Sequence, residues 1–180
     1  MRKLLVAMLC CIAWPTMAAN VVFETTQGSF TVELNEEKAP ITVKNFLRYV
    51  EDGSYEGSQF HRVIAGFMAQ GGGFDADLNR LATYAPIRNE ASNGLKNNVA
   101  TIAMARTSDP HSASRQFFIN LQDNDFLNYS ARNDGYAVFG KVTQGFEVIE
   151  SMAMQPTGIQ NGMKDVPVAP IVVNKVTLQK

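Results

Sequence analysis

Apolar and polar residues alternate in several short segments of the chain, which is the pattern of half-buried β-strands. In segment 29–34, Phe30, Val32 and Leu34 alternate with polar residues, and a second apolar run at 21–26 precedes it across a short Gln-Gly turn. Because successive side chains of a strand point to opposite faces, these two runs predict a hairpin with one buried face. Further strands are expected at 99–105, 116–120, 136–142 and 171–178.

Two segments have the spacing of amphipathic helices instead. The first begins at Pro40, a residue suited to the first turn of a helix, and repeats apolar side chains at helical intervals until Asp52 and Gly53 end it. The second covers 145–154 and has the same spacing. Each helix has a single apolar stripe, so each should lie against one other layer of the protein.

The stretch 60–74, with the sequence FHRVIAGFMAQGGGF, combines side chains that a plain core would not contain. Its β-branched residues and its triple glycine predict two short strands joined by a turn near Ala65 and Gly66. Arg62 lies here among aromatic and apolar residues, and a buried unpaired charge is costly. Arg62 is therefore either a strand-end residue whose head group reaches solvent or part of a site, and this stretch alone leaves both interpretations open.

Taken together, these segments amount to about eight short strands and two helices. The strands follow one another without helical crossovers, so the sheet should be mainly antiparallel. A sheet of this size can close into a barrel filled by side chains. The predicted fold is therefore mainly β, a closed eight-stranded antiparallel barrel capped by two α-helices, with any ligand site on its outer wall. Loops are expected at 75–98, 106–114, 123–134 and 158–170.

The N-terminal residues differ in character from the rest of the chain. A short positive region at 2–3 precedes an apolar run at 4–14, and small residues follow up to Ala18. This pattern is typical of a secretory signal peptide, and the apolar run is too short to span a bilayer. We predict cleavage after Ala18, with Ala19 as the alternative, which leaves 19–180 as one domain. A retained N-terminal anchor is the competing interpretation.

Removal of the signal peptide changes the composition in ways that bear on function. The full chain has a net charge of −1; without Arg2 and Lys3, 14 basic residues face 17 acidic ones, a net charge of −3. Both cysteines and the single tryptophan also leave, which excludes thiol catalysis and cysteine-based zinc sites. The small negative charge and the lack of a long basic run predict no binding to nucleic acid and no stable attachment to membranes.

Several familiar motifs fail on inspection. The segment that begins at Asp75 resembles a calcium loop but has Arg80 where that loop needs glycine, so no metal site is predicted. Asp109, His111 and Ser112 have the residue types of a hydrolase triad, but they lie in one short loop, whereas triad members normally come from separate elements.

The remaining candidates come from separate segments and combine apolar surface, amides and one arginine, without an obvious nucleophile or general base. Such a set suits the binding of an apolar peptide segment. The set comprises Arg62, Phe67, Met68, Gln70, Ala105, Gln116, Phe118, Phe126, Leu127 and Tyr136.

Four motifs carry a resemblance to a known family: FHRVIxGFMxQGG at 60–72, Met-Ala at 104–105, QFFI at 116–119 and VFGKV at 138–142. With these motifs in this order, the chain is similar to the cyclophilin family of peptidyl-prolyl cis–trans isomerases, most of all to its short bacterial members, and the signal peptide points to the periplasmic branch. The resemblance implies isomerisation of X–Pro bonds during the folding of exported proteins, with no cofactor, metal or covalent intermediate.

The resemblance also implies a role for each matching position. Arg62 resembles the catalytic arginine of the family, and His61 its structural neighbour. The walls of the proline pocket match Phe67, Met68, Phe118 and Leu127, and the contacts to the substrate backbone match Gln70, Ala105 and Gln116.

Four positions depart from the common family pattern. Phe126 replaces a tryptophan that contacts cyclosporin, so binding of this drug is expected to be weak. Tyr136 replaces a histidine at the pocket rim, and Ala65 replaces a proline in the turn. Arg106 replaces an asparagine, which should make the groove more favourable to acidic residues near the proline.

The expected partners are proline-containing unfolded or flexible polypeptide segments, and the domain is expected to act as a monomer in the periplasm. Two other functions stay open at this point. The first is a binding or chaperone module whose isomerase activity is incidental. The second is a hydrolase that uses His111 and Ser112.

Overall fold

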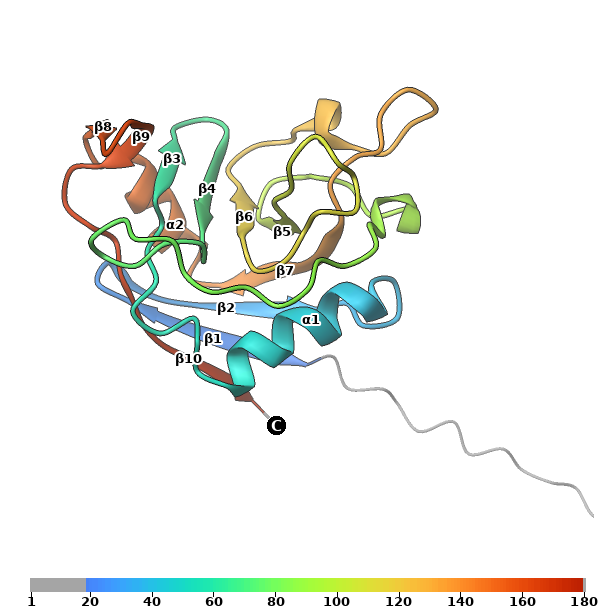
Figure 1. The fold of residues 1–180 in the computed structure, drawn as a ribbon, viewed down its shortest axis with the longest axis horizontal. Coiled ribbons are helices and arrows are strands. Elements are labelled where there is room, and N and C mark those ends of the chain that lie inside the picture. The colour runs from blue at the N-terminus through green and yellow to red at the C-terminus, as the bar shows by residue number, and fades with distance from the viewer. Residues whose placement is uncertain (1–18, 180) are drawn as a thin grey trace, which may run out of the picture.

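The structure is a computed structural model that describes residues 19–179, and the predicted signal peptide at 1–18 lies outside the described residues (Figure 1). Within this range, the larger sheet has eight strands, and every neighbouring pair is antiparallel. The strands are β1 (Asn20–Thr25), β2 (Gly28–Leu34), β3 (Arg62–Ile64), β4 (Met68–Gly71), β5 (Thr101–Met104), β6 (Phe117–Asn120), β7 (Val138–Gln144) and β10 (Val173–Gln179). Their order in space is β10-β1-β2-β7-β5-β6-β4-β3, so the predicted mainly β, antiparallel architecture is confirmed.

The two edges of this curled sheet meet where the segment that precedes β3 contacts the first residue of β10 and the residues just before it. The N–H of Gly57 donates to the carbonyl of Val173 at 2.8 Å, and the N–H of Val173 donates to the carbonyl of Ser58 at 2.8 Å. A third bond runs from the N–H of Phe60 to the carbonyl of Ile171 at 2.9 Å. Within the described chain, β3 and β10 themselves do not pair, so the barrel is joined by this short bridge rather than by a full strand ladder.

Aromatic side chains fill the concave side of the sheet. Phe23, Phe30, Phe46 and Phe117 are at most 1% exposed. The rings of Phe23 and Phe30 are stacked with centroids 4.8 Å apart, and those of Phe46 and Phe117 meet edge to face at 5.9 Å. Burial of each ring contributes roughly 1.5–3 kcal/mol relative to exposure, so this cluster supplies much of the stability of the domain.

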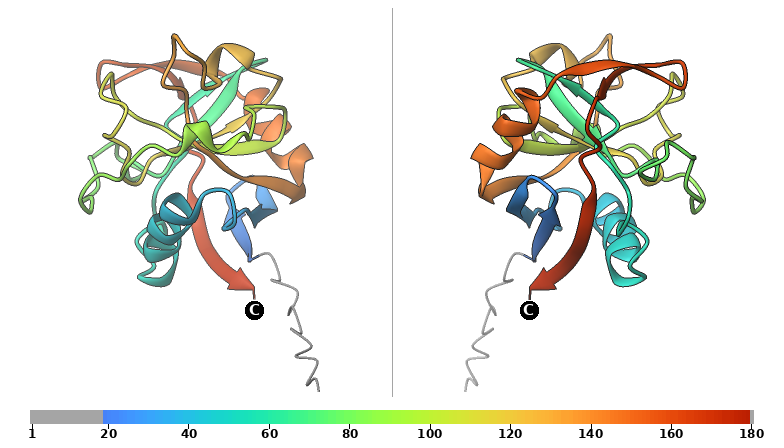
Figure 2. Two further views of the ribbon diagram at one scale, coloured as in Figure 1. Left: turned by 90° about the vertical axis from the view of Figure 1, so that its right-hand side faces the viewer. Right: turned by 90° about the vertical axis from the view of Figure 1, so that its left-hand side faces the viewer.

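Two α-helices lie within the described residues, well apart from each other on the sheet (Figures 1 and 2). Helix α1 (Pro40–Glu51) begins at the expected proline and directs Val43 and Phe46 into the aromatic core. Helix α2 (Phe146–Ala153) packs through Ile149 and Met152. Both apolar stripes are therefore covered, as the sequence predicted. None of the helices in the described range is long and apolar enough to cross a membrane.

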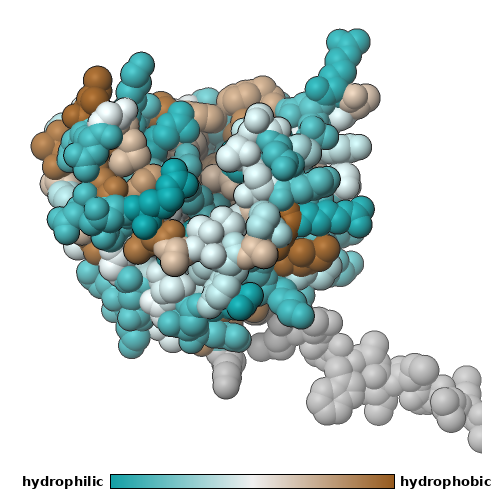
Figure 3. All heavy atoms as spheres, in the orientation of Figure 1, coloured by the Kyte–Doolittle hydropathy of each residue, from teal (hydrophilic) through white to brown (hydrophobic). Residues whose placement is uncertain are grey.

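One predicted loop, 158–170, is wrong. It contains a two-stranded sheet of β8 (Thr157–Gln160) and β9 (Met163–Pro167). Asn161 and Gly162 form the turn, with positive φ angles of 48° and 76°. Asn-Gly is the strongest short sequence signal of a hairpin, and the prediction of a loop did not take it into account. The hairpin lies beside β3 and presents an apolar surface in Figure 3, consistent with an exposed fraction of 72% for Ile159.

Candidate active site

A row of side chains crosses the outer face of the sheet from its edge inward. Arg62 on β3 is paired with Gln70 on β4, Gln70 with Phe118 on β6, and Phe118 with Ala103 on β5. Cross-strand partners point to the same face of a sheet, so pairing alone brings a cation, an amide and an aromatic ring together. The neighbouring residues in each strand point inward and join the core instead.

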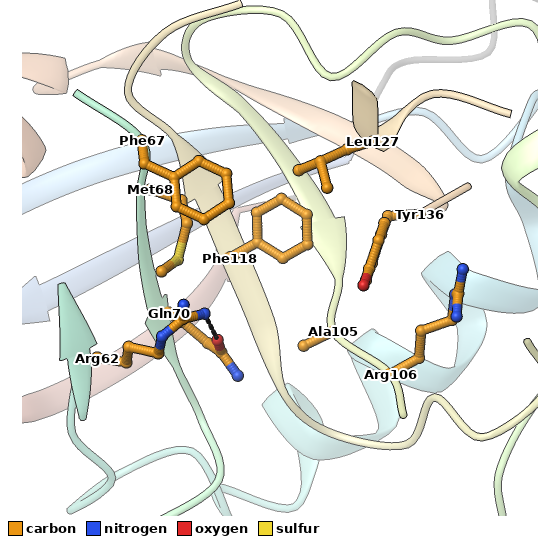
Figure 4. Close-up of a pocket in the computed structure, with 9 residues that line it drawn as sticks. All are labelled: Arg62, Phe67, Met68, Gln70, Ala105, Arg106, Phe118, Leu127 and Tyr136. Atoms are coloured by element: carbon orange, nitrogen blue, oxygen red, sulfur yellow. Dashed lines mark hydrogen bonds between the residues drawn. The ribbon is translucent and has the colours of Figure 1, made fainter. Parts of the chain in front are cut away.

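Arg62, Gln70 and Phe118 of this row line a cavity with a volume of about 120 Å³ on the outer wall of the sheet (Figure 4). Its apolar floor consists of Met68, Phe118 and Leu127, whose side chains are almost fully buried at 2%, 4% and 8% exposure. These residues belong to an apolar cluster separate from the aromatic core. The lining residues are Arg62, Phe67, Met68, Gln70, Ala105, Arg106, Phe118, Leu127 and Tyr136.

Polar groups lie on two sides of this apolar floor. On one side, Nη1 of Arg62 is 3.4 Å from Oε1 of Gln70, and Nε2 of Gln70 donates to Oε1 of Gln116 at 2.9 Å. On the other side, the guanidinium of Arg106 lies 4.5 Å from the ring centre of Tyr136 and donates to the carbonyl of Gly135 at 2.9 Å. Figure 4 shows Arg62 and Arg106 on opposite sides of the cavity. The site can therefore bind an apolar group between two cationic edges.

Three of the predicted site residues do not line the cavity. Phe126 lies at its rim, 63% exposed, with its ring stacked on Phe67 at 5.7 Å. Gln116 acts from the side, through its bond to Gln70. His61 is 5% exposed, and in the described chain its Nδ1 has no hydrogen-bond partner. Burial, with a smaller contribution from the charge of Arg62, lowers the pKa of His61 to about 4, so its imidazole is neutral at pH 7.

A chain of buried asparagines holds two of the cavity walls and was not anticipated from the sequence. Asn124 donates to the carbonyl of Phe67 at 3.0 Å and to Oδ1 of Asn120 at 2.8 Å. Asn120 donates to Oδ1 of Asn97 at 3.2 Å, and Asn97 donates to the carbonyl of Leu127 at 3.2 Å. Because satisfied buried polar networks are rigid, these amides fix the positions of Phe67 and Leu127 relative to each other.

Two further residues bear on the site and were missed. A Cβ atom on Gly73 would lie 2.5 Å from Cγ and Cδ of Gln116, so only glycine leaves room for that amide. Asp165, on the overlooked hairpin, places Oδ2 3.8 Å from Nε of Arg62. No local pattern in the sequence connects this residue with Arg62.

Comparison with known proteins agrees with this geometry. Residues 20–178 match the family model of the cyclophilin type peptidyl-prolyl cis-trans isomerases. The chain belongs to the cyclophilin family. It is 50% identical to peptidyl-prolyl cis-trans isomerase cyp18 of Streptomyces antibioticus, over 89% of this chain and 98% of that one. It is also 47% identical to peptidyl-prolyl cis-trans isomerase B of Escherichia coli (strain K12), over 89% of this chain and 99% of that one.

Solved structures show the same fold. A cyclophilin type peptidyl-prolyl cis-trans isomerase from Cryptosporidium parvum superposes with a TM-score of 0.74 at 25% identity, covering 91% of this chain and 98% of that one. The cyclophilin described here is therefore a peptidyl-prolyl cis–trans isomerase, and its family implies proline-containing peptide substrates.

The structure also decides against the hydrolase interpretation. The hydroxyl of Ser112 donates to the carbonyl of Asp109 at 2.7 Å, while Nδ1 of His111 accepts from the N–H of Asn89 at 3.2 Å. In residues 19–179, no hydrogen bond joins Ser112 to His111, so the serine has no base beside it. Asp75, the first residue of the rejected calcium loop, accepts hydrogen bonds from its own loop at Asp77 and Asn79.

Proposed function

We propose that this cyclophilin binds proline on the apolar floor of the cavity and that Arg62 lowers the barrier to rotation of the X–Pro bond. Rotation about an amide costs ~18–20 kcal/mol because the C–N bond has partial double-bond character. The two isomers of an X–Pro bond differ by only ~0.5–1 kcal/mol, so the enzyme has to change the rate and not the equilibrium. The reaction makes and breaks no covalent bond, which agrees with a site that lacks an evident nucleophile.

The observation that carries this proposal is a permanent cation at the edge of a cavity whose floor is apolar and almost fully buried. In the twisted amide, resonance is lost and the prolyl nitrogen becomes a hydrogen-bond acceptor. Arg62 can donate to that nitrogen or restrain the neighbouring carbonyl, and its guanidinium keeps its proton. The hydrogen bond from Arg62 to Gln70 is long, at 3.4 Å, so most N–H donors of Arg62 remain available to a substrate. A hydrogen bond from Arg62 that is stronger in the twisted state than in the planar one lowers the barrier. Each ~1.4 kcal/mol of such stabilisation accelerates the reaction by about tenfold.

The substrate proposal extends to proline-containing segments of unfolded or flexible chains. The Cryptosporidium parvum protein was also solved in the presence of the dipeptide Ala-Pro, and that structure has a TM-score of 0.73 to this chain. The cavity, at about 120 Å³, suits a small ring better than a large side chain. Arg106 at the other edge favours acidic residues near the proline. Phe126 at the rim, in place of tryptophan, is expected to leave cyclosporin binding weak.

The decisive experiment compares Arg62→Ala with the matched surface variant Arg132→Ala, since Arg132 is exposed and lies outside the cavity lining. We expect Arg62→Ala to lower kcat/KM on an X–Pro peptide by about a hundredfold or more, as for removal of one positioned donor, and Arg132→Ala to leave it unchanged. The same loss should appear in proline-limited refolding of a client protein.

If Arg62→Ala accelerated refolding as well as the unmodified protein does, the catalytic assignment would be wrong. An aggregation assay on the same variants addresses the chaperone alternative. Suppression of aggregation by Arg62→Ala, with isomerase activity lost, would show that both functions coexist in one site.

We also propose that the protein is exported to the periplasm after removal of residues 1–18. The N-terminal charge, the apolar run and the small residues up to Ala18 support this, and the family match begins only at residue 20. Because Trp14 is the single tryptophan, the mature protein should show no tryptophan emission, and mass spectrometry should place its N-terminus at Ala19. Tryptophan fluorescence of the protein purified from the periplasm would instead show that residues 1–18 are retained.

A further inference from the structure

The hairpin that the sequence pattern did not reveal brings a carboxylate to the catalytic edge. Strand β9 lies beside β3 although the two belong to different sheets (Figure 1). Oδ2 of Asp165 lies 3.8 Å from Nε of Arg62, and the two side chains are 42% and 41% exposed. No other ion pair is found within residues 19–179, so this contact is distinctive in the described chain.

The backbone at Asp165 restricts which residues can occupy the position. Its φ angle is 60°, in the left-handed region that most residues with a side chain avoid. Aspartate and asparagine enter this region more easily than other non-glycine residues, because their short polar side chains bond locally. The position therefore accepts Asp or Asn with little strain, which makes it possible to remove the charge while keeping the backbone.

The guanidinium of Arg62 is held from two sides by different nitrogen atoms. Nη1 faces the amide of Gln70 at 3.4 Å, while Nε faces the carboxylate of Asp165 at 3.8 Å. Neither contact is strong, and both are half exposed, but together they restrict the rotation of a long side chain that would otherwise have several rotamers. Because Nε faces the hairpin and Nη1 faces Gln70, which lines the cavity, the guanidinium lies between the hairpin and the cavity.

We infer that Asp165 is a positioning residue for Arg62 and that the β8–β9 hairpin is part of the catalytic machinery. This inference rests on the proposed role of Arg62. Asp165 does not line the cavity, so it acts on the reaction through the orientation of the guanidinium rather than through contact with the proline. Because the pair is exposed, its effect is limited in size and is screened by salt.

The test is the variant Asp165→Asn, which removes the charge and retains both the size of the side chain and its tolerance of the left-handed backbone. Glu36→Gln, in an exposed turn away from the cavity, is the control for an equal change in net charge. On an uncharged X–Pro peptide at low salt, we expect Asp165→Asn to lower kcat/KM by about two- to fivefold and Glu36→Gln to leave it unchanged. Raising the salt concentration should bring the unmodified protein down to the level of the variant.

Two readouts separate positioning from a purely structural role. In the Arg62→Ala background, adding Asp165→Asn should cause no further loss, because the residue it positions is absent. In NMR spectra, the Nε–H signal of Arg62 should shift in Asp165→Asn and not in Glu36→Gln. An unchanged rate together with an unchanged signal would overturn the inference, and so would a loss of rate that persists in the Arg62→Ala background. Full activity of Arg62→Ala alone would instead refute the proposed function, whatever Asp165→Asn does to the signal.

Discussion

Two arginines of this cyclophilin occupy opposite kinds of environment. Arg115 is 2% exposed and donates to three main-chain carbonyls, those of Gly72, Ala82 and Ser54, at 2.5 to 2.6 Å. Arg62 has a side chain that is 41% exposed and makes one long hydrogen bond and one loose ion pair. The comparison shows how a single residue type serves either the fold or the reaction, depending on where its donors are directed.

The difference follows from the cost of burying a charge. A cation taken out of water needs hydrogen-bond acceptors in the protein, and the backbone carbonyls around Arg115 supply them. N–H donors that are all bonded to backbone carbonyls, as in Arg115, are not available to a substrate. A catalytic cation must keep donors available, so it has to lie at the surface and accept weak restraints such as those of Gln70 and Asp165 on Arg62.

The largest effect on stability is expected from replacing Arg115, the arginine that serves the fold. Arg115→Met should lower the free energy of unfolding by about 3–5 kcal/mol, because the buried carbonyl of Gly72 and the part-buried carbonyls of Ala82 and Ser54 lose a charged donor, offset in part by burial of methionine. Urea denaturation measures this change. Arg62→Ala is the control and should shift the free energy of unfolding by no more than about 0.5 kcal/mol. Equal stability of the two variants would contradict the distinction.

A second, smaller effect concerns His61, the sequence neighbour of Arg62 that is buried rather than exposed. Its pKa is about 4 in the folded protein and 6.5 as the ordinary value, so the unfolded chain binds a proton at a pH where the folded protein does not. His61 therefore leaves stability unaffected at pH 7 and lowers it as the pH falls from 6.5 to 4, by up to about 3 kcal/mol.

The variant His61→Gln cannot titrate, so its free energy of unfolding should fall less steeply between pH 6.5 and 4 than that of the unmodified protein. Titration of carboxylates contributes equally to both, and the difference between the two curves isolates His61. Parallel curves would show that the imidazole is already protonated, or accessible to water, in the folded state. Isomerase activity at pH 7 tests separately whether His61 supports Arg62.

Much of the site could be predicted because its residues lie in short strands with regular spacing. Because side chains alternate along a strand, Met68 and Gln70 in 60–74 share one face, and Phe118 lies in the QFFI motif. The family resemblance also matched Leu127 to the wall of the proline pocket. The contribution of Asp165 could not be predicted in this way, since the sequence pattern predicts a loop at 158–170 and the contact with Arg62 joins segments far apart in the sequence. The role of the buried asparagines could not be predicted either, because an isolated asparagine is not part of a periodic pattern.

By itself, the sequence determined the local elements of this protein and its family. Strand alternation, helical spacing and the turn residues act over a few positions, so they can be recognised in an unfolded chain. Only the tertiary structure decided that residues 57–60 and 171–173 join the edges of the sheet, that Arg115 is buried while Arg62 stays exposed, and that Asp165 reaches Arg62. These contacts join residues that are far apart in the sequence, so packing and hydrogen-bond satisfaction across the whole fold determine the partners, and no repeating sequence pattern indicates them.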